Sequence, residues 1–352
     1  MTDGLEIRPV RGIGDITAGD DLAELIADAA PWLADGDVLV VTSKIVSKAE
    51  GRLVEVPADG PEREAAKAAA LVSETARVVA QRGPTTIVQT HHGFVMAAAG
   101  IDASNVDKTH LVLLPVDPDA SARKLRADFK ARGVDVAVVI SDTMGRTWRN
   151  GLTDVALGAA GIEPFRDHRG ETDPYGNELQ ITQMALIDEL AAAGELVKGK
   201  CDQVPVAVVR GVGSSSSSDG AGAVALLRDA ESDMFSLGTA EARAAGMRAA
   251  ALLPDGSQLA LPGTPVDPDA VSRAVSTVAD LLAHGTEVTP AEVLPGNGAT
   301  AALHVACPGN SPAAFMRLGA DVQRLRVALA AEGIPSVPLP HDDGIRLDLS
   351  GT

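Results

Sequence analysis

Aromatic residues and cysteines are scarce in this sequence of 352 residues. Aromatics make up only 2%, as two Trp, one Tyr and five Phe. This scarcity argues against a protein that stacks single-stranded nucleic acid on aromatic rings. The two cysteines, Cys201 and Cys307, are too few for a disulfide framework or a thiolate zinc site. They fit a reducing cytoplasm.

Export signals and membrane segments are also missing. The first residues contain no cationic stretch followed by an apolar one, and no apolar run is long enough to span a bilayer. We therefore expect a cytoplasmic protein with no membrane partner.

Positive charge is in deficit, because the formal net charge is -18 and the pI is about 4.7. Such a chain repels nucleic acid and anionic lipid at long range. An anionic small molecule would bind only where basic residues or a divalent cation reverse the local field. We expect no nucleic-acid partner.

The pattern of apolar residues predicts an α+β protein. A hydrophobic content of 45% with 22% charged residues is ordinary for a globular chain. Apolar runs bounded by Gly, Asp and Ser predict buried strands at 37–44, 110–116, 134–142 and 204–211, and a hairpin over 85–100 that turns near His92 and Gly93. Helical periodicity covers 20–36, 63–83, 118–133 and 182–197.

The length predicts two domains, and the composition predicts where they meet. A helix over 238–253 is followed by a stretch rich in Pro, Gly and Asp, so we expect domains at 1–253 and 254–352. In the second domain we expect a helix beginning near Asp267 and Pro268, a strand at 302–307 and a long helix over roughly 311–333.

Two acids on separate segments form the first candidate site. Asp102 and Asp142 each follow small or β-branched apolar residues, and Thr143 adds a hydroxyl. Mg²⁺ or Mn²⁺ that handles nucleotide phosphates needs one or two carboxylates and open positions for phosphate oxygens. The alternative is that both acids cap turns.

Basic residues gather after the strand at 37–44. Lys44 and Lys48 are four residues apart and would share a helix face. Ser43 and Ser47 add hydroxyl groups, and Arg52 follows shortly after. This cluster could bind phosphate or carboxylate, or it could be a solvated helix start.

Several common motifs are absent. The sequence has no Walker phosphate loop, no G-x-G-x-x-G after the first strand, no H-E-x-x-H and no G-x-S-x-G. Residues 173–182 place Asp173, Tyr175, Asn177 and Glu178 around one Gly, which would suit either a substrate pocket or an ordinary turn.

Six blocks in order resemble one family. They are "IRPVRGIGDITAGDDLAELI", "DGDVLVVTSKIVSKAEGR", "AAAGIDASNV", "LLPVDPDASARKLR", "VVISDTMGRTWRNG" and "DPYGNELQIT", within residues 5 to about 250. Together they look like the coenzyme F420-0:L-glutamate ligases, also called F420 gamma-glutamyl ligases. The resemblance implies a GTP-dependent ligase that adds L-glutamate to coenzyme F420-0, and then further gamma-linked glutamates, through an acyl phosphate. It also implies an α+β fold of two subdomains and a homodimer.

The resemblance also implies roles for individual residues. Asp102, Asp142 and Thr143 would hold Mg²⁺ or Mn²⁺, with K⁺ as a further candidate ion. The positions that match the GTP site are Ile13, Gly14, Asp15, Ile16, Ser43, Lys48 and Asn105. Our own inference from side-chain chemistry is that Arg146 and Arg149 meet anionic groups of the substrates.

Two features depart from the family pattern. A further acidic or amide metal ligand is expected before the strand at 204–211, where Asp202 and Gln203 are the candidates. Residues 315–339 resemble a nitroreductase helix, so we expect the tail to be a shortened nitroreductase-like region that has lost FMN. Two other functions remain open on the sequence: a non-catalytic deazaflavin or nucleotide-binding protein, and a metal-dependent phosphatase.

Overall fold

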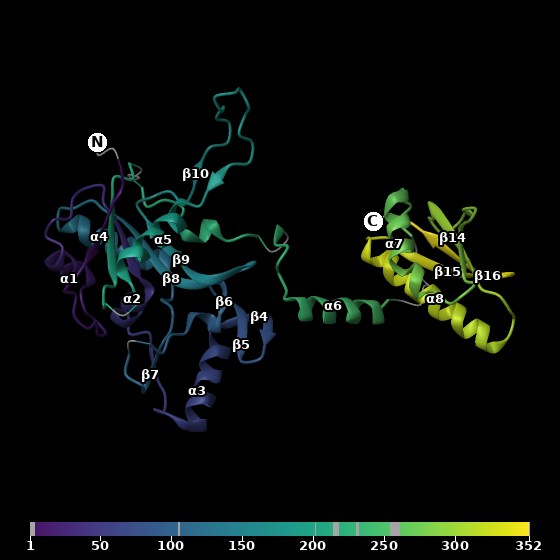
Figure 1. Ribbon diagram of the computed structural model, residues 1–352, viewed down its shortest axis with the longest axis horizontal. Helices are drawn as coiled ribbons and strands as arrows, with labels where there is room; N and C mark the ends of the chain where they lie inside the picture. Colours follow the sequence, from purple (N-terminus) through teal and green to yellow (C-terminus); the bar gives the residue numbers. More distant parts are fainter. Residues whose placement is uncertain are drawn as a thin grey trace. The chain divides into compact units, whose positions relative to one another are not determined.

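The computed structural model describes residues 4–104, 106–200, 202–213, 218–229, 232–253 and 261–351. The chain divides into two compact units, Met1–Glu241 and Ala242–Thr352 (Figure 1). The division falls within helix α6 (Thr239–Ala251), the helix after which the sequence places the domain boundary. Helices and strands are mixed in both units, so the α+β prediction is confirmed. Among the described residues, no helix is both long and apolar enough to cross a membrane.

The N-terminal unit is built on a five-stranded sheet. Its strands, in spatial order, are β1 (Glu6–Val10), β12 (Val206–Arg210), β2 (Val38–Thr42), β8 (Ala137–Arg146) and β9 (Arg149–Ala160). Strands β2 and β8 are parallel, and the other neighbours are antiparallel.

Both faces of this sheet are covered by helices, which explains the continuous apolar runs. Leu39 and Val41 point into the core beneath α1 (Leu22–Ala29) and α4 (Pro118–Ala131). Val38 and Val40 point into the core beneath α5 (Leu186–Lys198).

Smaller elements surround the sheet. They are α2 (Ser43–Ala49), β3 (Leu53–Glu55), α3 (Gly60–Ser73), β4 (Thr75–Arg82), β5 (Thr85–Thr90), β6 (Val95–Ala97), η1 (Ala98–Gly100), β7 (His110–Val112) and η2 (Ala223–Leu226). The hairpin predicted over 85–100 is confirmed as β5 and β6.

The helix predicted over 63–83 is wrong in its second half. The helix α3 ends at Ser73, and Thr75–Arg82 is strand β4, which pairs with β5. Alanines favour the helix in the first half, whereas the segment after Glu74 gains cross-strand hydrogen bonds to β5.

Residues 166–184 form an arm that projects from the N-terminal unit (Figure 1). Its base is the pair β10 (Arg166–Asp167) and β11 (Gln183–Met184). Near the tip, the carboxylate of Asp173 accepts hydrogen bonds from the amides of Tyr175 and Asn177, and Tyr175 is 91% exposed. Of the two interpretations of this segment, the structure therefore supports the turn.

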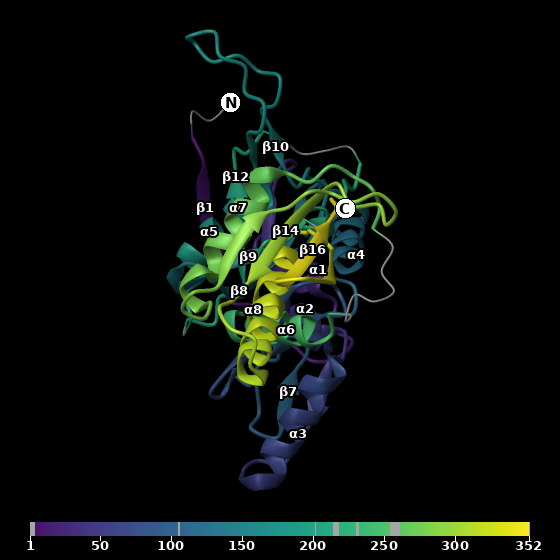
Figure 2. The ribbon, with the colours of Figure 1, turned by 90° about the vertical axis from the view of Figure 1, so that its right-hand side faces the viewer.

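The C-terminal unit is a four-stranded antiparallel sheet with two helices on one face. The strands lie in the order β13 (Glu287–Pro290), β14 (Ala301–Ala306), β16 (Gly344–Leu349) and β15 (Ser336–His341). Helices α7 (Pro268–Val278) and α8 (Pro312–Ala331) share one apolar core with the sheet (Figure 2). Asp267 and Ser311 cap these helices, as the predicted helix starts require.

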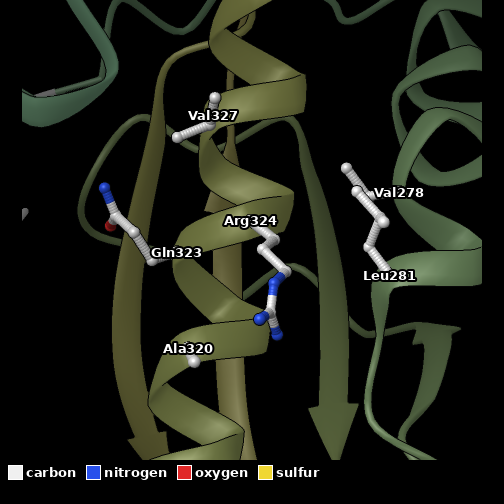
Figure 3. Close-up of a pocket in the computed structure, with 6 residues that line it drawn as sticks. All are labelled: Val278, Leu281, Ala320, Gln323, Arg324 and Val327. Atoms are coloured by element: carbon white, nitrogen blue, oxygen red, sulfur yellow. The ribbon is translucent and has the colours of Figure 1, made fainter. Parts of the chain in front are cut away.

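A shallow groove of about 400 Å³ lies between α8 and the end of α7 with the following turn η4 (Ala279–Leu281) (Figure 3). Its walls are mostly apolar, with Val278 and Leu281 on one side. Its one charged group, Arg324, forms an ion pair of 2.6 Å with Asp321. The groove therefore offers no set of reactive groups.

Candidate active site

Asp142 and Thr143 lie in the hairpin formed by β8 and β9. The sequence predicts a strand at 134–142 that ends at Asp142. In the structure this strand, β8, continues to Arg146 and pairs with β9 as far as Arg149. Side chains alternate along a strand, so those of Asp142 and Thr143 point to opposite faces. Neither residue is in a turn.

On one face, Asp142 contacts the start of α2, and the next residue of α2 contacts Asp102. Its carboxylate accepts hydrogen bonds from the Ser43 hydroxyl and from the Thr143 amide, the latter at 2.7 Å. Asp102 is held in place by two backbone hydrogen bonds to Val112. Lys44 Nζ lies 2.5 Å from Asp102 Oδ2 and donates to Ser104 at 2.8 Å. The charge of Lys44 is thus committed to Asp102.

The two acids differ in electrostatics. Burial is the main cause that raises the pKa of Asp142 to about 6, and the charges of Asp154 and Asp102 add to the increase. The hydrogen bond from the Thr143 amide acts in the opposite direction and lowers this pKa. Burial would also raise the pKa of Asp102, but hydrogen bonds from Lys44 and Ser104 outweigh it and lower that pKa. Because the charge of Asp102 contributes to the raised pKa of Asp142, the two carboxylates repel each other.

This pair fits a hard divalent cation. Asp102 and Asp142 supply carboxylate oxygens, which Mg²⁺ and Mn²⁺ prefer. In the part of the chain that the structure describes, no Lys or Arg forms an ion pair with Asp142. A bound cation would replace the repulsion between the two acids with attraction to both.

On the opposite face, Thr143 belongs to a second polar cluster. Its hydroxyl donates to Asp154 Oδ1 at 2.6 Å and lies 2.6 Å from Lys200 Nζ. The other oxygen of Asp154 accepts from Ser141 at 2.9 Å and from Lys198 at 2.9 Å. The Thr143 hydroxyl, which was expected beside Asp142 as a metal ligand, therefore lies beside Asp154 and Lys200 on the opposite face.

Asp154 and Lys198 were not predicted from the sequence. Their side chains are only 2% and 3% exposed, and Lys198 is the last residue of α5. Burial raises the pKa of Asp154, but the charge of Lys198 and the hydrogen bonds around it outweigh burial and lower it. The available signal was a charged residue at the start of the apolar run "DVALGAA", at a position that the strand buries.

The predicted nucleotide loop follows β1. Ile13 and Ile16 are buried in the core, whereas Gly14 and Asp15 are exposed. A backbone hydrogen bond of 2.8 Å from Gly19 to the end of α2 connects this loop to the helix that carries the other candidates. Ser43 is the buried first residue of α2, and Lys48 lies in its last turn. Asn105 lies outside the described residues.

Two of the three basic residues near α2, Lys44 and Arg52, pair with different acids. Lys44 pairs with Asp102, while Arg52 donates to Glu74 at 3.0 Å and to the carbonyl of Leu114 at 2.9 Å. Of the two interpretations left open for these basic residues, the contacts of Arg52 do not support its part in a shared phosphate cradle. The hydrogen bonds of Arg52 to Glu74 and Leu114 hold its side chain in this position.

The remaining candidates are exposed. Arg146 and Arg149 flank the hairpin turn at Thr147 and Trp148, and Arg146 donates a long hydrogen bond of 3.4 Å to the Asn150 carbonyl. Asp202 and Gln203, considered as a further metal ligand, are exposed in the segment that leads into β12. These four side chains are therefore accessible from solvent.

Comparison with known proteins identifies the relatives of this chain. A family model described as F420-0:Gamma-glutamyl ligase matches residues 12–211. The coenzyme F420:L-glutamate ligase of Methanothermobacter thermautotrophicus is 41% identical over 249 residues, which cover 66% of this chain and 99% of the relative. A protein of the same name from Methanopyrus kandleri is 42% identical over 221 residues, covering 59% of this chain and 87% of the relative. One from Halobacterium salinarum is 44% identical over 218 residues, covering 57% and 85%.

Proposed function

Because the chain belongs to the F420-0:gamma-glutamyl ligase family, we propose that it adds L-glutamate to coenzyme F420-0 at the expense of GTP. Its place in coenzyme F420 biosynthesis as a ligase follows from the family and from the shared name of its relatives. The nucleotide, the metal and the steps of the reaction are our proposal. The observation that carries it is that the neighbouring residues Ser43 and Lys44, at the start of α2, contact Asp142 and Asp102 respectively, so that α2 lies against both acids.

The proposed reaction has two steps. A carboxylate oxygen of F420-0 attacks the γ-phosphorus of GTP, so that an acyl phosphate forms and GDP leaves. The amine of L-glutamate then attacks the acyl carbon, a C–N bond forms, and the C–O bond to phosphate breaks with release of phosphate and a proton. Repetition on the terminal glutamate would add further gamma-linked residues.

Asp102 and Asp142 would hold the divalent ion, which supplies charge neutralisation at the nucleotide phosphates when bound. Ser43 connects this pair to the nucleotide region, because its hydroxyl bonds Asp142 while its backbone begins α2. Thr143 follows Asp142 directly, and its amide already donates to that carboxylate.

The GTP-binding residues are proposed as Ile13, Gly14, Asp15, Ile16, Ser43, Lys48 and Asn105. The exposed backbone at Gly14 and Asp15, anchored by two buried isoleucines, supports binding through main-chain groups. The exposed guanidinium groups of Arg146 and Arg149 suit carboxylate or phosphate groups of the substrates.

We further propose a cytoplasmic homodimer that uses K⁺ as a second ion. Tyr175 and Ile181 on the arm are 91% and 90% exposed, which provides apolar surface that a second copy could cover. The mass of the protein in light scattering tests the dimer, and a monomer would contradict it.

For the C-terminal unit, the proposal remains a shortened nitroreductase-like region without FMN. Flavin absorbance in the purified protein would contradict this part of the proposal and leave the ligase proposal untouched.

The mass of the product tests the ligase. The full chain is incubated with GTP, Mg²⁺, F420-0 and L-glutamate, and we expect products heavier by whole glutamyl units. Phosphate release that does not depend on L-glutamate would instead indicate a phosphatase. Tight binding of F420-0 or GTP without turnover would indicate a binding protein.

A further inference from the structure

Three metal-ligating side chains converge in the C-terminal unit. His304 lies on β14, His341 ends β15, and Asp343 lies in the turn between β15 and β16. His304 Nε2 and His341 Nδ1 lie 2.9 and 2.8 Å from the same oxygen, Asp343 Oδ1. The two rings are 4.8 Å apart between centroids, and the three ligand atoms all lie within 4.8 Å of one another.

The strand register produces this convergence. Val305 pairs with Ile345 across β14 and β16, while His341 pairs with Gly344 in the β15–β16 hairpin. A Cβ on Gly344 would lie 2.3 Å from the Val305 carbonyl oxygen and 2.9 Å from His304 Nε2. The glycine therefore leaves the room that the His304 ring occupies.

The cluster is not fully satisfied by its own contacts. His304 Nε2 is shielded from solvent and, among the described residues, makes no hydrogen bond of acceptable geometry despite its distance of 2.9 Å from Asp343. Both imidazoles lie within hydrogen-bonding distance of the same oxygen of Asp343. One anionic oxygen thus faces two imidazole nitrogens that compete for it.

We propose that His304, His341 and Asp343 form a binding site for a divalent transition-metal ion of the Zn²⁺ type. Two imidazoles and one carboxylate are three of the four ligands of a tetrahedral Zn²⁺ site, and the exposure of His341 and Asp343 leaves the fourth position to water or another ligand. Imidazole nitrogen favours Zn²⁺, Co²⁺ or Ni²⁺ over Mg²⁺. The site therefore differs in metal preference from the carboxylate pair of the N-terminal unit.

The site would also connect strands. An ion bound here would link β14 to the turn between β15 and β16, so that metal binding stabilises the C-terminal unit. Residues 304–343 lie outside the 12–211 range that matches the ligase family, and the proposal does not depend on ligase activity.

Co²⁺ binding to the full-length protein tests the proposal. The protein is stripped with EDTA, returned to buffer with excess Mg²⁺ to occupy sites of oxygen ligands, and titrated with Co²⁺ while the visible absorption is recorded. We expect one equivalent with the intense bands of four-coordinate Co²⁺, displaced by Zn²⁺. We expect His304→Gln and Asp343→Asn each to weaken binding at least tenfold, since each removes one ligand.

The controls separate this site from others. His284→Gln changes an exposed histidine of the same unit and should leave Co²⁺ binding unchanged. Asp142→Asn should also leave it unchanged. His341→Gln removes a half-exposed ligand and should weaken binding while preserving the circular dichroism spectrum. Absence of the Co²⁺ bands, or bands that persist in all three ligand variants, would overturn the proposal.

Discussion

Asp154 and Lys198 form an ion pair of 2.9 Å that is almost wholly shielded from solvent. The pair joins the middle of β9 to the last residue of α5, and Asp154 also binds the Thr143 hydroxyl. The hairpin that carries Asp142 is thereby fixed from its opposite face. This buried polar cluster therefore holds the hairpin in place, but none of its side chains would bind a cation held by Asp102 and Asp142.

Removal of Lys198 should be strongly destabilising. Lys198→Met removes the buried cation of Asp154 and leaves only the exposed Lys200, 3.8 Å away; breaking a buried pair in this way costs about 3–5 kcal/mol. We expect a loss of this size in the free energy of unfolding, measured in urea.

Lys200→Met is the matched control, because Lys200 is 62% exposed and should contribute less than about 1 kcal/mol. The double variant Asp154→Asn with Lys198→Met should recover part of the loss, since no unpaired charge remains. Equal stability of Lys198→Met and wild type would show that the pair is not formed.

Gly158 on β9 should tolerate no side chain. A Cβ there would lie 2.2 Å from the Pro118 carbonyl oxygen, at the start of α4. Gly158→Ala should therefore cost about 1–3 kcal/mol in thermal or urea unfolding, because backbone must move apart. Gly145→Ala on the same hairpin has open space around it and should cost far less. Equal effects of the two substitutions would contradict the packing of α4 against β9.

The carboxyl group of Asp142 should make stability depend on pH in metal-free buffer. Its pKa is about 6 in the folded protein against an ordinary value of 3.8, so the folded state binds the proton more tightly. Ionisation of this carboxyl group destabilises the folded state. The destabilisation is absent below about pH 4, grows as the pH rises to about 6, and reaches roughly 3 kcal/mol above about pH 6.

The measurement compares wild type with Asp142→Asn in EDTA. The variant should gain stability relative to wild type as the pH rises from 4 to 7. Added Mg²⁺ should raise the unfolding free energy of wild type more than that of the variant. A difference in unfolding free energy that stays constant over this range would exclude the raised pKa.

Arg146 is expected to act in substrate binding and not in stability. Because its side chain is exposed, Arg146→Ala should change the unfolding free energy by less than about 0.5 kcal/mol. Loss of a charge-assisted hydrogen bond to an anionic substrate should raise the KM for F420-0 or L-glutamate about tenfold. Arg82→Ala, exposed at the end of β4, is the control. Unchanged KM values for both substrates in Arg146→Ala would contradict the assignment.

The sequence was sufficient where burial imposes a pattern. The apolar runs around Val40, Val139 and Val208 predicted three central strands, because a sheet covered on both faces needs apolar residues throughout. Capping residues such as Asp267 marked helix starts for a local reason, since the side chain bonds an amide two residues away.

The sequence was not sufficient where pairing between distant segments decides. Thr75–Arg82 is a strand only because β5 lies beside it, and Asp142 is inside a hairpin only because β9 extends to Arg149. The ion pair of Asp154 with Lys198 and that of Arg52 with Glu74 likewise depend on tertiary contacts that no local pattern encodes.

The most direct test of the central claim is the product mass formed by wild type and by Asp142→Asn under identical conditions with GTP, Mg²⁺, F420-0 and L-glutamate. Asp128→Asn, which changes a surface acid of α4 paired with Lys124, is the matched control. We predict glutamylated F420 from wild type and the control, and at least about a hundredfold less from Asp142→Asn, because the cation loses a charged ligand. Glutamylation by Asp142→Asn at a rate near that of wild type would contradict the account.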